Sequence, residues 1–371
     1  MPKLLKELVA ISIKLSRVSE DLLDDNFKMK KKGVLLLNLG SPNSTSVADV
    51  RKYLREFLMD GRVLDAPFPI RWFVVHALIL PTRPKESAEA YGEVWLPEGS
   101  PLIVTSQHQA DALEKQLEDI PVELAMRYQN PSIENAVDKL LAEGVEQLVI
   151  LPLFPHYAMS SYESALVKAQ NVLAKKAPQV ELEVVPPFYD DDEFVDAMVA
   201  SSAGYLSEGY DHILFSFHGL PERHLRKSDP TGEHCLSCEN CCEGTHPAHK
   251  TCYRSQCYKT VEAFVEKVGV PAEKHSVSFQ SRLGRDPWLK PYTDFTVKEL
   301  AGKGVKKLLV VCPAFVADCL ETIEEIGMRA KEDFVEAGGE DLTLVPCVNE
   351  HPRWLEGMET LTRRHLERLP A

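Results

Sequence analysis

The chain of 371 residues is 44% hydrophobic and 26% charged, a composition typical of globular proteins, and it is long enough for two domains. Its formal net charge of −14, without a basic arm or stripe, argues against a nucleic-acid partner. We expect no export signal in the first thirty residues and no membrane span, because no apolar run approaches the roughly 20 residues that a span requires. A cytoplasmic location would keep the nine cysteines reduced, so metal ligands are expected among them rather than disulfides.

Residues 1–32 form a separate N-terminal segment. Leucine, isoleucine and valine recur there at helical spacing between lysines and glutamates, which predicts a helix packed on the main body. A helix lying on a membrane surface and a disordered extension are the alternatives.

The first expected strand is the continuous apolar run GVLLLNL at residues 33–39, a pattern typical of a strand buried on both faces of a parallel sheet. A small-residue turn follows, and Ser46 can cap a helix that begins at residue 47. Such a unit presents ligand contacts beyond the carboxyl end of its strand, but Gly40 lacks the partner glycines of a dinucleotide fingerprint.

Residues 64–84 are rich in Phe, Trp, Ile and Leu and are interrupted by prolines. We expect a buried helix within this stretch. The alternative is a hydrophobic lip that covers an apolar ligand or contacts a membrane.

The second half of the chain repeats the first. GVEQLVIL at residues 144–151 matches GVKKLLVV at residues 304–311, and GVLLLNLGSP at 33–42 resembles HILFSFHGLP at 212–221. The alternation of strands and helices predicts an α/β protein with two similar Rossmann-like lobes, each a parallel sheet flanked by helices, and a cleft between them. We expect the lobes at residues 33–188 and 189–351, with a cysteine-rich insertion near 229–258. A C-terminal helix is expected at residues 352–371.

Two features in the second half could carry chemistry. His218 closes an apolar run, where a parallel sheet presents ligand contacts. Asp318, Glu321 and Glu325 follow the run at 308–311 and would form one acidic face on a helix. Such a face is usually only solvated, but here it would point into the same cleft as His218. A histidine opposite carboxylates can accept protons and hold a divalent cation without burying it tightly.

Six of the nine cysteines lie between residues 235 and 257, with the spacing C-x2-C-x2-CC-x9-C-x4-C. Their polar surroundings argue against a packing role, and four thiolates suit either Zn²⁺ or a [2Fe–2S] cluster; the spacing does not separate the two. We expect the adjacent Cys241 and Cys242 not to serve together easily, because neighbouring side chains diverge. The other three, Cys312, Cys319 and Cys347, are expected to be small buried side chains.

Several separated motifs resemble the signatures of ferrochelatase, the enzyme that inserts ferrous iron into a porphyrin to make haem. In the second half these are SFHGLPER, SFQSRLGRDPWLKPYT and CPAFVADCLETIEEI, and in the first half LLNLGSP, AMRYQNP and LPLFPHY. The resemblance covers nearly the whole chain from about residue 33. It implies a chelatase-type fold and an enzyme, a metal-chelating lyase, with a porphyrin and Fe²⁺ as substrates. A soluble or peripherally membrane-associated protein is expected.

The resemblance also implies roles for single residues. His218 matches the active-site histidine and Glu321 its partner carboxylate, and both would contact the metal. Asp318 and Glu325 fall on the acidic face that would pass metal in or protons out. We expect the imidazole and the carboxylate helix to come from different lobes and to face each other across a porphyrin-sized gap.

In the first half, Arg127 and Tyr128 match an Arg-Tyr pair of the porphyrin pocket. Leu39 lies on the porphyrin-facing segment after the first strand, and the resemblance assigns it no catalytic role.

Some ferrochelatases carry a [2Fe–2S] cluster, and a subset holds it with an internal insertion at this place in the chain. The resemblance therefore favours a [2Fe–2S] cluster over zinc. We expect Cys235, Cys242, Cys252 and Cys257 to be its ligands, with Cys241 next.

Several functions stay open. Protoporphyrin IX is the expected substrate and coproporphyrin the alternative, while a cobalt or nickel chelatase acting on a more carboxylated tetrapyrrole would share the fold. The apolar residues 68–80 favour the more hydrophobic porphyrin. An iron–sulfur sensor or a haem carrier is the non-enzymatic alternative, but a carrier would not need both His218 and Glu321.

Overall fold

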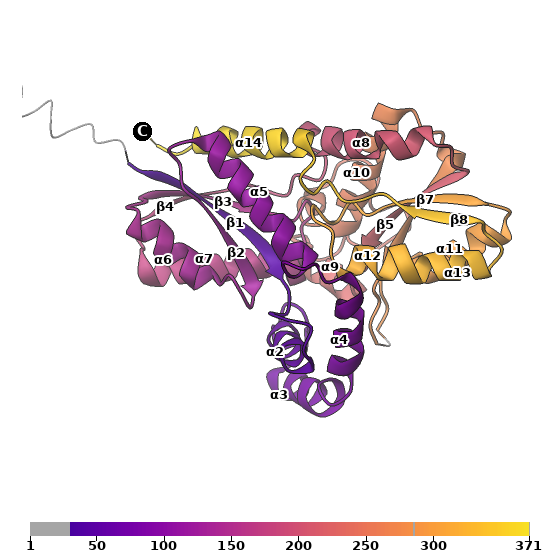
Figure 1. The fold of residues 1–371 in the computed structure, drawn as a ribbon, viewed down its shortest axis with the longest axis horizontal. Helices are drawn as coiled ribbons and strands as arrows, with labels where there is room; N and C mark the ends of the chain where they lie inside the picture. The colour runs from indigo at the N-terminus through magenta and orange to yellow at the C-terminus, as the bar shows by residue number, and fades with distance from the viewer. Residues whose placement is uncertain (1–29, 285, 371) are drawn as a thin grey trace, which may run out of the picture.

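The computed structural model describes residues 30–284 and 286–370. Nearly all of the N-terminal helix expected at residues 1–32 therefore lies outside the described residues. Within them, two four-stranded parallel sheets lie side by side (Figure 1). The first sheet has the order β2–β1–β3–β4, with β1 (Lys32–Gly40), β2 (Val122–Tyr128), β3 (Gln147–Pro152) and β4 (Glu181–Val184). The second has the order β6–β5–β7–β8, with β5 (His212–His218), β6 (His275–Gln280), β7 (Lys307–Val311) and β8 (Asp341–Leu344).

The two sheets share one topology, which confirms the prediction of two similar α/β lobes. The matching segments at 144–151 and 304–311 contain β3 and β7, each of which pairs in parallel with the central strand of its sheet. The repeat extends to the loops, because β2 and β6 are both followed by a cis proline, Pro131 in the first lobe and Pro291 in the second. The domain boundary expected near residue 188 stays a prediction.

Eight helices of the described chain cover the faces of the two sheets. In chain order they are α5 (Pro101–Leu117), α6 (Ile133–Ala142), α7 (Ser164–Lys176), α8 (Asp192–Ser207), α10 (Tyr253–Val268), α11 (Thr293–Gly302), α13 (Lys331–Glu336) and α14 (Pro352–Leu366). Shorter elements are α9 (Glu222–Ser228), α12 (Leu320–Ile323), the π-helices η2 (Met159–Glu163) and η5 (Glu325–Ala330), and the 3₁₀ turns η3 (Pro247–Lys250) and η4 (Ala272–Lys274).

Alternation along the central strands divides the core into layers. In β1, Leu35 and Leu37 pack with α6 and α7, whereas Val34 and Leu36 face α5 and α14. In the second lobe, α11 and α13 cover one face and α8 and α10 the other. The layer formed by α5, α14, α8 and α10 is one continuous core that joins the lobes (Figure 1). The C-terminal helix α14 thus covers the first sheet although it follows the second in sequence.

An arm of helices projects from the first lobe (Figure 1). It consists of α2 (Val47–Leu58), α3 (Phe68–Phe73), the π-helix η1 (Val74–Ile79) and α4 (Arg83–Val94), and Ser46 caps α2 as expected. The buried helix predicted within residues 64–84 is wrong, because Phe68, Phe73 and Leu78 are 55–60% exposed. Of this stretch, Val75 and Leu80 are buried in a core cluster and Leu64 and Ile79 pack against it partly buried, so the alternative of an exposed hydrophobic lip describes the rest better. In the described part of the chain, no helix combines the length and apolarity needed to cross a membrane.

Candidate active site

A pocket opens between the lobes, where the central strands of both sheets end. The end of β1 and the loops after β3 and β7 contribute to its lining, together with the last residue of β5 and the arm. Most of the lining is apolar or aromatic, including Leu39, Phe57, Phe154 and Phe315. Leu39 lies where it was expected. The pocket therefore combines hydrophobic walls with a few polar groups, a pattern typical of sites for small organic ligands.

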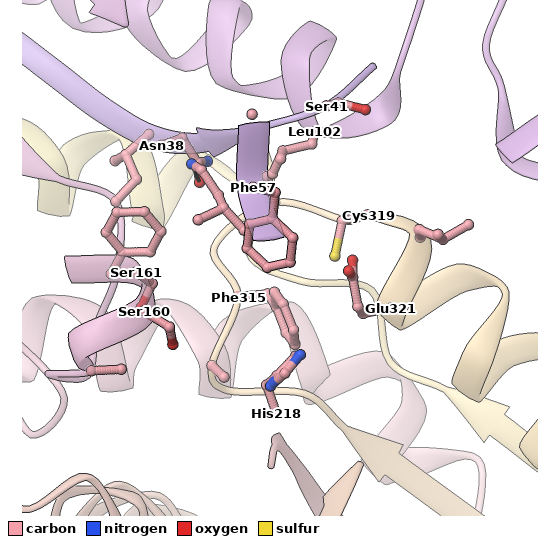
Figure 2. A pocket seen from close by; sticks show the side chains of 18 of the residues that line it. Asn38, Ser41, Phe57, Leu102, Ser160, Ser161, His218, Phe315, Cys319 and Glu321 are labelled. Carbon is pink, nitrogen blue, oxygen red and sulfur yellow. Dashed lines mark hydrogen bonds between the residues drawn. The ribbon is translucent and has the colours of Figure 1, made fainter. Parts of the chain in front are cut away.

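His218 is the last residue of β5, and its side chain lines the pocket (Figure 2). Its Nδ1 lies 2.7 Å from the carbonyl oxygen of Gly219, which can only accept, so Nδ1 carries the proton. The lone pair on Nε2 is therefore available to a ligand. Gly219 is needed here because a Cβ at this position would lie 2.7 Å from the carbonyl oxygen of Gln280 on the neighbouring strand.

Glu321 lies in the first turn of α12, just after the loop that follows β7, and lines the same pocket (Figure 2). Both His218 and Glu321 thus come from the second lobe, at the ends of the paired strands β5 and β7. The expectation that they face each other from different lobes is wrong, because neighbouring parallel strands end at the same edge of one sheet. The first lobe and its arm supply the rest of the wall.

Proton-bearing groups surround the Glu321 carboxylate. The Cys319 thiol is hydrogen-bonded to it, and burial together with this negative charge raises the pKa of Cys319 well above its usual value. Burial is also the main cause, and the Glu321 charge a further one, of the raised pKa of Tyr91. Tyr53 shows the same shift, caused first by burial. These groups stay neutral at ordinary pH and present proton-bearing atoms to the carboxylate.

The other two expected carboxylates do not line the pocket. Asp318 accepts hydrogen bonds from Asn349 Nδ2 at 2.7 Å and Thr322 Oγ1 at 2.9 Å. Glu325 accepts from the backbone N–H of Ser281 at 2.8 Å and from its hydroxyl. The single acidic helix face predicted for Asp318, Glu321 and Glu325 is wrong. The α-helix begins only at Leu320, after Asp318, and the π-helix η5 at Glu325 breaks the 3.6-residue period.

Arg127 and Tyr128 also lie outside the pocket lining. Arg127 pairs with Asp60 at 2.6 Å and donates from Nε to Ser164 Oγ at 2.7 Å, while the Tyr128 hydroxyl donates to Asp60 at 3.0 Å. Burial raises the pKa of Asp60, but hydrogen bonds, first from Ser164, and the charge of Arg127 outweigh it and lower that pKa. These contacts tie the end of α2 to β2 and α7. In the described protein, Arg127 and Tyr128 thus hold neighbouring elements together and do not line the pocket, where the porphyrin contact was expected.

The six clustered cysteines lie in the loop between α9 and α10 and in the first turns of α10. The thiol of Cys252 lies beside those of Cys235 and Cys242. Arg254 donates to Cys241 Sγ at 3.0 Å and to Cys242 Sγ at 3.2 Å. The expectation that these two neighbours diverge is wrong, because the turn at 241–244 brings both thiols to one guanidinium.

The remaining two of the six clustered cysteines are placed differently. Cys238 is exposed, and Cys257 is buried next to the Tyr253 hydroxyl on α10. The structure thus places Cys252 beside Cys235 and Cys242, and Cys241 beside the same guanidinium as Cys242. Cys257 lies close enough to Cys242 to be influenced by its charge. Among residues 30–284 and 286–370, no three His, Cys, Asp or Glu side chains are arranged around one metal-ion position.

Hydrogen bonds fix the conformation of the loop at residues 229–252, called the thiol loop below. Asp229 accepts from the backbone N–H groups of His234 and Cys235 at 2.7 and 2.8 Å, and burial is outweighed by these bonds, which lower the pKa of Asp229. The Nε2 atoms of His234 and His249 lie 2.7 and 2.9 Å from the carbonyl oxygen of Cys241. The loop is thus built around its thiols by several independent contacts.

Sequence reasoning missed several pocket residues. Tyr53 and Tyr91 come from the arm, and no local pattern marks them as ligand-facing. Cys319 is buried as expected, but it lines the pocket. His156 lies in the motif LPLFPHY and Tyr253 directly follows Cys252, so the sequence contained local signals that could have marked both as pocket residues.

Comparisons with known proteins agree with this arrangement. The sequence profile of a family described as Ferrochelatase matches residues 31–366. A protein named ferrochelatase from Pseudomonas fluorescens (strain Pf0-1) is 53% identical over 337 residues, which are 91% of this chain and 98% of that protein. Another, from Ectopseudomonas mendocina (strain ymp), is 52% identical with the same coverage. Among solved structures, SirB from Bacillus subtilis with Fe³⁺ has a TM-score of 0.52 at 13% identity, covering 90% of this chain and 95% of that one, which shows a shared fold.

Proposed function

Because the chain belongs to the ferrochelatase family and is a metal chelatase, we propose that it inserts Fe²⁺ into protoporphyrin IX to form haem. The observation that best supports this substrate is the pocket itself, which combines His218 and Glu321 with extensive apolar walls. Its lining, as far as the chain is described, contains no Lys or Arg to pair with additional carboxylates. This composition favours protoporphyrin over coproporphyrin and over more carboxylated tetrapyrroles.

The physical problem of the reaction is that a flat porphyrin hides its nitrogens and carries two pyrrole protons that must leave. We assign proton removal to His218, whose Nε2 is free to accept one pyrrole proton, pass it to solvent and then accept the second. The imidazolium that forms keeps its Nδ1–H bond to the Gly219 carbonyl. Glu321 supplies the negative charge that attracts and orients the ferrous ion. Since both groups lie on the second lobe, iron delivery and proton removal use one side of the pocket.

The apolar walls supply the third requirement, distortion of the ring. Contacts that Leu39, Phe57 and Phe315 make with the porphyrin periphery provide binding energy remote from the reacting nitrogens. That energy can offset the cost of ruffling the macrocycle. A carrier protein does not need to distort the porphyrin, so distortion of the bound ring would distinguish an enzyme from a carrier.

An insertion assay tests the proposal. Fe²⁺ or Zn²⁺ is supplied with protoporphyrin IX or coproporphyrin, and metalloporphyrin formation is followed by absorption. We expect turnover with both metals and a higher kcat/KM for protoporphyrin. Tight porphyrin binding without insertion would support the carrier, and a preference for cobalt or nickel with a more carboxylated ring would support the alternative chelatase.

We further propose that the thiol loop holds a [2Fe–2S] cluster, with Cys235, Cys241, Cys242 and Cys252 as ligands. The donor set fits, because these are soft sulfur ligands that lie close together: Cys252 is beside Cys235 and Cys242, and Cys241 shares the Arg254 guanidinium with Cys242. A two-iron cluster takes two thiolates per iron. Arg254 offsets part of their negative charge. Cys241 replaces Cys257 of the expected set on the basis of these contacts. When bound, the cluster supplies a one-electron redox centre.

Visible absorption of the purified protein, with iron and sulfide analysis, tests this assignment. A brown protein with two irons and two sulfides per chain is expected. A colourless protein with one zinc per chain would contradict it and support a zinc site.

We also propose that the protein is located in the cytoplasm and contacts the membrane peripherally through the exposed hydrophobic lip at residues 64–84.

A further inference from the structure

Tyr253 stands between the thiol site and the pocket. It is the first residue of α10, directly after Cys252 and before Arg254, and both of these neighbours contact other thiols of the loop. Tyr253 itself lines the pocket beside His218. One helical turn therefore carries contacts to both sites.

The Tyr253 hydroxyl reaches the pocket histidine through the backbone. It donates to the main-chain oxygen of His218 at 2.9 Å. Only 5% of Tyr253 is exposed, so this hydrogen bond is shielded from water. The bond fixes the carbonyl at the end of β5, next to the Gly219 carbonyl that orients the imidazole.

The Tyr253 side chain also contacts a residue of the pocket and one of the clustered cysteines. Its ring packs edge-on against His156, with centroids 5.8 Å apart, and His156 packs on Phe217, the residue before His218. On the other side, its hydroxyl lies next to the buried Cys257 thiol. Few internal degrees of freedom remain, so a shift of the first turn of α10 must move the His218 backbone.

We propose that Tyr253 is a positioning residue, which holds His218 in its proton-accepting orientation and couples that orientation to the state of the thiol site. This inference rests on the proposed chelatase reaction and on the proposed cluster. The coupling is mechanical, because Cys252 and Tyr253 are consecutive residues at the start of one helix. A change in cluster geometry at Cys252 therefore reaches His218 through one side chain.

The test compares the cluster-loaded wild-type protein with Tyr253→Phe, which keeps the ring and removes the hydroxyl. We expect kcat to fall about tenfold while KM for porphyrin stays within about twofold, because orientation and not binding is lost. Hydrogen–deuterium exchange of the segment 212–222 should accelerate about fivefold, as the loss of one buried hydrogen bond predicts. Tyr162→Phe is the matched control, because it removes a buried tyrosine bond to the Val185 carbonyl without contacting His218.

Coupling is measured by the same exchange experiment on oxidised and dithionite-reduced protein. Reduction should change exchange of residues 212–222 in the wild type and in Tyr162→Phe, but not in Tyr253→Phe. Unchanged kinetics in an active, brown Tyr253→Phe protein would overturn the inference while the proposed function stands. Equal responses to reduction in the wild type and Tyr253→Phe, or no response in the wild type, would overturn the coupling. A wild-type protein without insertion activity or without a cluster would instead defeat the proposals on which the inference rests, and the inference with them.

Discussion

The proton on Nδ1 of His218 is directed at the carbonyl oxygen of Gly219, 2.7 Å away, and this bond fixes which ring nitrogen is free. An asparagine amide can replace the Nδ1 donor but offers no acceptor where Nε2 stands. His218→Asn should therefore keep the local backbone and lose about 10²- to 10⁴-fold in kcat, the usual contribution of a proton-transfer group. Porphyrin binding, measured by fluorescence quenching, should change less than about threefold. A variant that retains most of its turnover would show that Nε2 accepts no proton.

A substitution of Arg127 tests whether this residue stabilises the fold or binds the porphyrin. Removing one partner of the buried pair with Asp60 should lower the free energy of unfolding by about 3 kcal/mol, because the remaining charge is left unpaired. We expect this loss in Arg127→Met by denaturant titration, with KM for porphyrin nearly unchanged in the folded enzyme. Arg83→Met, which breaks an exposed pair with Glu86, is the control and should cost less than about 0.5 kcal/mol. A large rise in KM at unchanged stability would restore the expected role in the pocket.

The cysteine assignment predicts different results for single serine variants. Cys241→Ser should lose most of the visible absorption, because it removes one of the four grouped thiols. Cys257→Ser should retain it, since that thiol is packed beside Tyr253, and the exposed Cys238 provides the matched control. Iron and sulfide content measured on the same samples completes the comparison. The opposite order of Cys241→Ser and Cys257→Ser would return Cys257 to the ligand set.

Arg254 should tune the cluster. Its positive charge and its N–H bonds to the sulfurs of Cys241 and Cys242 stabilise the more negative, reduced state. Arg254→Gln should therefore lower the midpoint potential by about 60 mV for each ~1.4 kcal/mol of stabilisation lost. A spectroscopic redox titration measures this directly. A potential that stays the same or rises would place the guanidinium outside the influence of the cluster.

The exposed lip predicts membrane binding. Phe73 and Leu78 are 55% and 59% exposed, on the arm beside the pocket. Replacing both with serine should weaken sedimentation with phospholipid vesicles about fivefold or more, because apolar side chains drive such binding. Phe295→Ser is the control, since Phe295 is 58% exposed but lies on α11 of the other lobe. Equal losses for both changes would indicate nonspecific adsorption.

The parts of the fold set by local pattern could be predicted from the sequence. Continuous apolar runs marked the central strands, and the repeat indicated a second copy of the sheet. His218 was placed correctly because a strand's carboxyl end is a local property. The predictions that were wrong concern residues whose positions depend on tertiary packing, which a short sequence pattern does not reveal. Arg127 is drawn to Asp60 of the arm, and the helix near Asp318 begins late because Asn349 and Thr322 hold that carboxylate outside it.

The path of the C-terminal helix has a consequence for the chain as a whole. Trp354 of α14 stacks on Phe188, at the junction between the lobes, and Lys32 of β1 donates to the carbonyl oxygen of Leu366. A helix that follows the second sheet in the sequence thus completes the cover of the first sheet. Without α14, the face of the first sheet that carries Val34 and Leu36 would be left partly uncovered, so the first lobe depends for its folding on a segment that lies beyond the second lobe.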